Sequence, residues 1–84
     1  MSTYTTDVII EGKHLTLEIE EVQAQDGRQF FVHAKQGTME MQCFSVKESK
    51  GEWNMGTPLI NWIKRHQYYL LDMVKRTIPP YNFQ

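Results

Sequence analysis

The chain is poor in the residues that mark several large classes of protein. It has one cysteine among 84 residues, which excludes an internal disulfide and fits a reducing compartment, so we expect a cytoplasmic protein. No apolar run approaches the roughly 20 residues that a membrane-spanning helix needs, so we expect no membrane association. The first residues, Met1 to Tyr4, contain neither a basic nor an apolar segment and so indicate no signal peptide.

Motifs for catalysis and metal binding are also missing. The five glycines are scattered, so they form no phosphate-binding loop, and no HExxH, CxxC or Asp-rich calcium loop occurs. The nucleophile elbow of the hydrolases is absent as well. We therefore expect no catalytic residue, no metal ligand and no cofactor, and we predict that the protein is not an enzyme.

What is present describes one small globular domain spanning residues 1–84. The chain is 40% apolar and 23% charged, which is an ordinary globular composition. A domain of this size buries only about 60% of the surface that its unfolded chain exposes. The core is therefore thin, and self-association would bury additional apolar surface.

Glycine-containing turn signals divide the first two-thirds of the chain into segments of alternating polarity. The turn signals are Gly12-Lys13, Asp26-Gly27, Gln36-Gly37 and Lys50-Gly51. The expected strands are 4–11, 14–23, 28–35 and 38–48, and a short segment at 52–55 adds a fifth. Such short connections join antiparallel neighbours. The sequence thus predicts an α+β fold, a four- to five-stranded antiparallel β-meander with one C-terminal amphipathic helix packed on one face.

The turns also predict which strand residues face the helix. They place Ile10 opposite Leu15, Ile19 opposite Val32, and Ala34 opposite Met39, so that apolar residues meet apolar residues. The expected inner face comprises Val8, Ile10, Leu15, Leu17, Ile19, Phe30, Val32, Ala34, Met39, Met41 and Cys43. The same register points Glu21 inward near Phe30, so we expect a β-bulge or a longer loop there.

A helix is expected over 58–78. Thr57 is a good N-cap before Pro58, and Pro79-Pro80 cannot continue the helix, which leaves an extended tail at 79–84. Its apolar arc of about 200° is wider than one flat sheet face can cover. Either the sheet curls around the helix, or a second surface covers part of it. His66 lies on the apolar side, where we expect a neutral, hydrogen-bonded core histidine.

The predicted registers leave an apolar cluster on the sheet face opposite the helix. Its members are Val22, Phe31, Phe44 and Val46. A contiguous exposed apolar patch usually marks an interaction surface. The leading hypothesis is a small non-catalytic protein-interaction module that self-associates, most simply as a homodimer, or binds another protein through this patch. The tail folding back over the patch is the structural alternative.

A polar row is expected on the same outer face. It aligns Asp7, Glu18, His33 and Glu40 across four strands. Carboxylates beside an imidazole can bind a divalent metal or shift the histidine pKa. Carboxylates and histidine are also common on solvated strands, and no local metal signature accompanies the row, so no metal is assigned.

The helix carries a basic stripe, whereas the strands are acidic. Residues 1–57 contain five basic and nine acidic side chains, and residues 58–84 contain four basic and one acidic. The stripe consists of Lys64, Arg65, Tyr68, Lys75 and Arg76. Basic residues with an aromatic can bind phosphates and stack a base, so single-stranded nucleic-acid binding is the alternative function. The order of four strands and then a helix is similar to that of small single-stranded DNA-binding folds of the Whirly and transcription-coactivator type.

Overall fold

The computed structural model describes residues 2–24, 27–56 and 60–79. Five strands are followed by two short helices: β1 (Thr3–Ile10), β2 (Lys13–Ala24), β3 (Gly27–Gln36), β4 (Met39–Ser49), β5 (Glu52–Met55), α1 (Asn61–Arg65) and α2 (Gln67–Thr77). The strands form one antiparallel sheet in the order β1-β2-β3-β4-β5. The predicted α+β meander is confirmed, with five strands. No helix within the described residues is long and apolar enough to cross a membrane.

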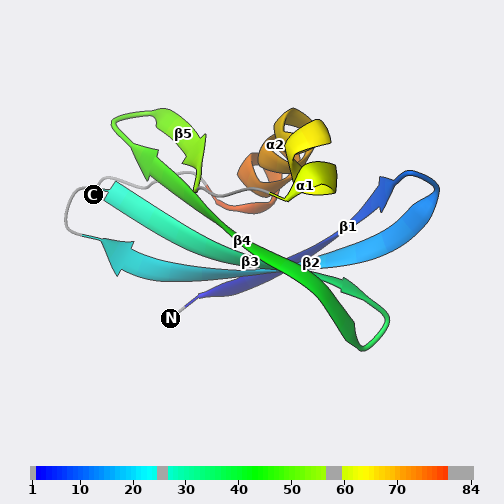
Figure 1. Cartoon of the computed structure of the whole chain (residues 1–84). Coiled ribbons are helices and arrows are strands. Elements are labelled where there is room, and N and C mark those ends of the chain that lie inside the picture. Colours follow the sequence, from blue (N-terminus) through cyan, green and yellow to red (C-terminus); the bar gives the residue numbers. More distant parts are fainter. Residues whose placement is uncertain (1, 25–26, 57–59, 80–84) are drawn as a thin grey trace.

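The sheet is strongly twisted and curls beneath the helices (Figure 1). α2 contacts both β1 and β5, the two edge strands, and so lies across the opening of the curl. This arrangement accounts for the wide apolar arc of the helical region, because the curled sheet approaches it from two sides. Of the two arrangements that the sequence allowed, the sheet that curls around the helix is the one observed.

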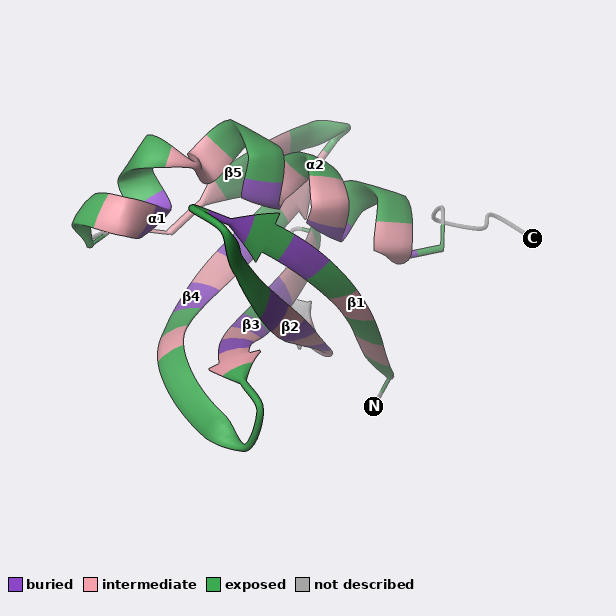
Figure 2. Cartoon of the chain, turned by 90° about the vertical axis from the view of Figure 1, so that its right-hand side faces the viewer, coloured by how far each residue is buried: buried purple, intermediate pink, exposed green. Residues whose placement is uncertain are grey.

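The core lies between the concave face of the sheet and the helices (Figure 2). Alternate strand residues point into it, as the period of two requires. The buried apolar side chains are Val8, Ile10, Leu15, Leu17, Ile19, Phe30, Val32, Ala34, Phe44, Val46, Ile63, Leu70, Val74 and Ile78. The predicted inner faces of β1, β2 and β3 are therefore confirmed.

The pairing of β2 with β3 is the register that the sequence predicted, with Ile19 opposite Val32 and Leu17 opposite Ala34. The first hairpin differs. Its turn is Glu11-Gly12, with φ angles of 51° and 78°, and it places Val8 rather than Ile10 opposite Leu15. Two positive φ angles are those of a type I′ turn, the usual two-residue hairpin connection. Because the register moves by two residues, every side chain keeps its predicted face.

In β4 the predicted inner and outer residues are wrong. Lys35 pairs with Glu40 but Ala34 pairs with Gln42, so Met41 is an extra residue that forms a β-bulge. This one-residue shift exchanges the two faces of the strand that follows it. Phe44 and Val46 are consequently buried, at 6% and 0% exposure. Met39, Met41 and Cys43, which the sequence placed in the core, are exposed.

The bulge that we expected near Glu21 does not occur, because Glu21 pairs directly with Phe30 across β2 and β3. An ion pair accommodates the inward carboxylate instead. Nε of Arg28 lies 3.2 Å from Oε2 of Glu21, and the guanidinium lies over the Phe30 ring, 5.1 Å from its centroid. Arg28 also donates to the carbonyl oxygen of Pro79, which ties the end of the helical region to this end of the sheet.

The predicted single helix is broken in two at His66, whose φ and ψ are −113° and 21°. Neither proline nor glycine lies near the break, so no local residue type marks it. α2 ends at Thr77, and Ile78 is extended, which confirms the predicted end. The expected N-cap at Thr57, Pro58 and the tail residues 80–84 lie outside the described residues.

Candidate functional site

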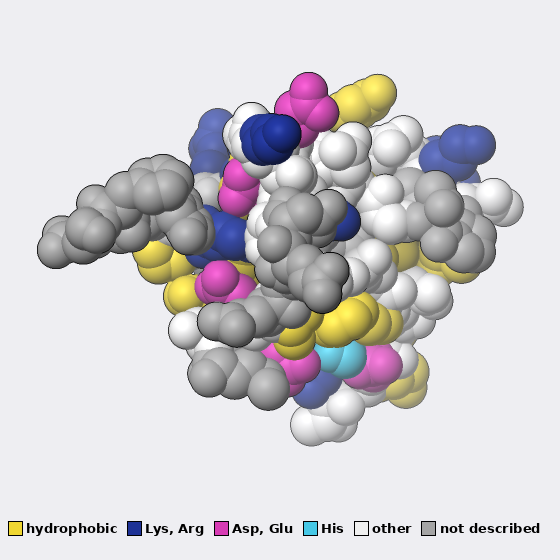
Figure 3. Space-filling model, turned by 90° about the vertical axis from the view of Figure 1, so that its left-hand side faces the viewer, with side chains coloured by type: hydrophobic (Ala, Val, Ile, Leu, Met, Phe, Trp, Pro, Cys, Tyr) yellow, Lys and Arg dark blue, Asp and Glu magenta, His cyan; other side chains and the backbone are white. Residues whose placement is uncertain are grey.

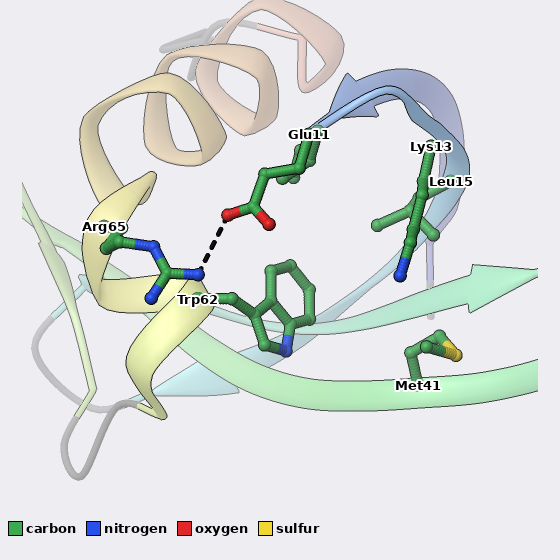
Figure 4. A pocket seen from close by; sticks show the side chains of 7 residues that line it. Glu11, Lys13, Leu15, Met41, Trp62 and Arg65 are labelled. Carbon is green, nitrogen blue, oxygen red and sulfur yellow. Dashed lines mark hydrogen bonds and ion pairs between the residues drawn. The ribbon is translucent and has the colours of Figure 1, made fainter.

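An apolar cleft of about 290 Å³ opens where the β1–β2 hairpin, β4 and α1 meet (Figure 4). Its lining residues are Ile10, Glu11, Lys13, Leu15, Met41, Trp62 and Arg65. Ile10 and Leu15 belong to the core, and the half-buried Trp62 extends the apolar wall toward the mouth. The cleft exists because α1 covers only part of the concave sheet face at this end.

One rim of the cleft is held by an ionic cluster. Oε2 of Glu11 accepts a hydrogen bond of 2.9 Å from Nη2 of Arg65 and lies 3.0 Å from Nε2 of His66. The hydrogen bond from His66 and then the Arg65 guanidinium hold the pKa of Glu11 below its ordinary value of 4.5. His66 is half-buried, and it forms the hydrogen bond that the sequence predicted, with Glu11 as its partner at the rim rather than in the core. The cluster fixes the first turn of the sheet against the helix break.

Lys13 lies on the opposite rim and reaches toward the mouth of the cleft (Figure 4). Because it pairs with the buried Ile10 across the hairpin, its side chain leaves the sheet on the concave side. Among the described residues no acid lies within ion-pair distance of its ammonium group. The cleft thus combines an apolar wall with one cation that is available to a ligand.

Met41 lines the cleft on the side of β4, and Met39 precedes it by two residues on the same strand. Met39 is 65% exposed, and Met41 is 38% exposed. Methionine is unbranched and polarizable, so it adapts to apolar partners of different shape. The β-bulge is responsible for this placement, because Met41 is the residue that the ladder leaves unpaired.

Sequence reasoning did not find this cleft. It assigned Met41 and Leu15 to the core, Glu11 to the end of strand 4–11, and Lys13 to the turn that follows. The cleft depends on the bulge at Met41 and on the break at His66, whose ring is hydrogen-bonded to Glu11 of the first hairpin. No proline, glycine or other local residue type predicts either the bulge or the helix break.

The predicted outer patch of Val22, Phe31, Phe44 and Val46 is not assembled. Val22 is half-buried and Phe31 is 36% exposed, and they are diagonal neighbours on β2 and β3. Phe44 and Val46 lie on the other face, in the core. Polar residues surround the remaining pair, since Phe31 lies between Glu20 and Ser45. Two apolar side chains do not make the contiguous patch that the hypothesis required.

The predicted polar row is brought together only in part. Glu18 pairs with His33 across the strands, and Nδ1 of His33 lies 2.9 Å from Oε1 of Glu40. Glu18 also forms an ion pair with Lys35 at 2.9 Å. Asp7 is displaced from the row, because it pairs with Thr16 and accepts a hydrogen bond from its hydroxyl. Within residues 2–24, 27–56 and 60–79, no group of three or more acidic, His or Cys side chains is arranged to hold a metal ion.

The basic stripe is exposed but divided between two helices. Lys64 and Arg65 belong to α1, and Tyr68, Lys75 and Arg76 to α2. Carboxylates pair with two of its cations, Glu11 with Arg65 and Asp72 with Arg76, each at 2.9 Å. Nζ of Lys75 lies over the Trp53 ring, 5.9 Å from its centroid. On the face shown in Figure 3, basic side chains are interspersed with acidic and hydrophobic ones.

Comparison with known proteins finds no family model, no curated protein and no solved structure that matches this chain.

Proposed function

We propose that this chain is a small, non-catalytic protein-interaction module, and that the cleft at the β1–β2 hairpin is its binding surface. The partner is a protein segment that carries an apolar side chain next to an acidic one. The apolar side chain enters the cleft between Trp62 and Met41, and the carboxylate pairs with Lys13. The single cysteine fits a module that works in the reducing cytoplasm.

The observation that carries the proposal is the position of Lys13 beside an open apolar wall. Glu11, Arg65 and His66 satisfy one another on one rim, so the charge left for a ligand is positive. Interaction energy at protein interfaces concentrates in a few anchors that fill well-packed pockets. An acidic residue flanking such an anchor adds orientation and partner choice through charge complementarity.

The size of the cleft favours a side-chain anchor over an enclosed small molecule. Pockets that enclose drug-sized ligands usually measure about 300–1,000 Å³, and the cleft lies just below this range at about 290 Å³. Met41 in its lining is 38% exposed, and Met39, two residues earlier on β4, is also exposed, which supports contact with a longer segment.

The nucleic-acid alternative has less support. The five stripe residues are split by the break at His66, and carboxylates already pair with two of the four cations. Nine acidic side chains on residues 1–57 also oppose a polyanion near the sheet.

The proposal is tested by selecting binders from a displayed library of random linear peptides on the purified protein. The expected result is enrichment of sequences with an aromatic or branched aliphatic residue next to Asp or Glu. A selected peptide should bind at least about tenfold more weakly to Met41→Lys, which places a charge in the apolar mouth. Selection on Lys13→Glu should instead enrich basic residues beside the anchor.

Phe31→Ser provides the matched control, because Phe31 is exposed on the opposite sheet face. It should leave peptide binding unchanged. A library that yields no enriched apolar–acidic pair would refute the proposal, and so would a selected peptide whose affinity is insensitive to both Met41→Lys and Lys13→Glu.

A further inference from the structure

β1 is an edge strand of the sheet, and its residues Thr3, Thr5 and Asp7 do not line the cleft. Within the part of the chain that the structure describes, β1 pairs with one strand, β2. The carbonyl of Ser2 accepts a hydrogen bond from the amide of Glu21, so the even-numbered residues direct their backbone groups toward β2. The amide of Ile9 instead donates to the Tyr69 hydroxyl at 3.4 Å, away from β2. The backbone groups of the odd-numbered residues therefore face the free edge.

Tyr69 occupies this edge only at Ile9. The three other edge-facing residues, Thr3, Thr5 and Asp7, have exposed side chains, and none of them pairs with a described residue outside β2. The N-terminal part of β1 runs away from the helices, as Figure 2 shows. An unpaired row of amides and carbonyls is a template for another strand.

β1 also lacks the features that natural edge strands use to prevent pairing. Within Thr3–Ile10 there is no proline, no lysine and no bulge, and Asp7 is the one charged residue. The opposite edge is shorter, because β5 has only four residues, Glu52–Met55. The contrast singles out β1 as the edge that is open to addition of a strand.

We infer that a second copy of this chain occupies the edge, with the two β1 strands antiparallel about a twofold axis at Thr5. In this arrangement Thr5 lies opposite Thr5 of the second copy. Thr3 of each copy lies opposite Asp7 of the other copy. Each of these pairs exchanges two backbone hydrogen bonds, which gives about six in total. The two five-stranded sheets become continuous.

The charges and the Tyr69 contact select this register over its neighbours. A twofold axis at Asp7 would place two carboxylates directly opposite each other, which is destabilising. An axis at Thr6 would pair Ile9 with Thr3 of the second copy and displace the Tyr69 hydroxyl. The axis at Thr5 engages all three uncovered residues, leaves Ile9 in place, and sets Asp7 beside a threonine hydroxyl. On the concave side, the half-buried Tyr4 gains Thr6 of the second copy as a neighbour.

Sedimentation analysis of the full chain across about a hundredfold concentration range tests the inference, because dimer formation follows mass action. The wild type should pass from monomer to dimer. Thr5→Pro removes a backbone amide that faces the free edge and donates no hydrogen bond to β2. Edge strands tolerate proline at such positions. The variant should stay monomeric with an unchanged circular dichroism spectrum, whereas Thr5→Val, which keeps the amide, should dimerise like the wild type.

A charge exchange tests the register separately, and it keeps the test valid if the proline variant fails to fold. Thr5→Lys and Thr5→Asp each place like charges opposite each other, so each alone should dimerise at least about tenfold more weakly than the wild type. An equimolar mixture of the two should regain dimer as a mixed pair.

A wild type that is monomeric at every concentration would overturn the inference, as would a dimer that survives Thr5→Pro. A mixture of Thr5→Lys and Thr5→Asp that gains no dimer would overturn the twofold axis at Thr5. Because Thr5 does not line the cleft, these outcomes leave peptide binding there unaffected, and the two proposals fail or stand independently.

Discussion

Trp53 on β5 stacks against Phe30 on β3, with ring centroids 5.7 Å apart and planes within 11° of parallel. β4 lies between these two strands in the sheet, so the stacking spans a strand and requires a curved surface. Arg28 lies over the Phe30 ring, and Lys75 lies over the Trp53 ring. The aromatic pair thus joins β5, the core and the last turn of α2.

Trp53→Ala should therefore lower the free energy of unfolding by about 2 kcal/mol, between the value of a stacked pair and that of a fully buried aromatic. Chemical denaturation measures this, and near-ultraviolet circular dichroism reports the loss of the stacked rings. Trp53→Phe keeps a ring at the site and should recover most of the stability. Equal losses for the two variants would show that the stacking contributes little.

The bulge at Met41 predicts opposite behaviour for two phenylalanines of adjacent strands. Phe44 is buried on the concave face, so Phe44→Ala should cost about 3–5 kcal/mol of unfolding free energy. Phe31 is exposed on the convex face, so Phe31→Ala should cost about 0.5 kcal/mol or less. Urea denaturation of both variants decides between the observed register and the one expected from the turns, in which both side chains would share the outer face.

The ionic cluster at Glu11 predicts a pH dependence of stability. Its pKa is lowered in the folded protein, first by the hydrogen bond from His66 and then by Arg65. A carboxylate of this kind stabilises the folded state above its ordinary pKa of 4.5, and the stabilisation is lost as the pH falls through the lowered value. Glu11→Gln should thus be less stable than the wild type near neutral pH, and the difference should shrink on acidification.

Unfolding free energies measured from neutral pH into the acidic range test this relation. Glu52→Gln is a suitable control, because Glu52 is exposed and has no ion pair among the described residues. Its stability should follow the wild-type profile. A gap between Glu11→Gln and the wild type that stays constant at all pH values would contradict the assigned role of the carboxylate.

Cys43 should react with iodoacetamide in the folded protein, because the bulge leaves it exposed. Partial burial, and then the neighbouring Glu40, raise the pKa of its thiol above the ordinary 9.0. The thiolate is the reactive form, so alkylation should be slow at neutral pH and accelerate in alkaline solution. Mass spectrometry follows the reaction, and Glu40→Gln should be modified faster at the same pH. Modification that required denaturant would indicate a buried thiol and contradict the observed face of β4.

The elements that the sequence predicted well are those whose signals are local. Glycine marked all four turn regions, and alternation fixed the inner faces of β1, β2 and β3. The first turn was displaced by one position, yet the two-residue change in register preserved every face of the hairpin. The third turn was displaced by one position as well, because Gln36 rather than Ala34 pairs with Met39. The wide apolar arc correctly indicated either a curled sheet or an additional covering surface.

The elements that the sequence did not predict depend on tertiary contacts. Nothing in the residues around Met41 distinguishes a bulge from a regular strand, because methionine, glutamine and cysteine are acceptable on either face. The break at His66 follows no proline or glycine, and coincides instead with contacts to Glu11, 55 residues away in the chain. The cleft depends on both features, and therefore could not be found by local reasoning.

Counted from its turn, β4 contains one residue more than a regular hairpin requires. If Met41 were deleted, Glu40 would still face Lys35 and Gln42 would still face Ala34, so the hydrophobic order of the strand would survive. A deletion between Cys43 and Val46 would instead turn core residues toward water. The hairpin is therefore tolerant of shortening at one position and intolerant a few residues later. That tolerant position lines the cleft, so a variant shortened there would retain the fold while its binding surface changes shape.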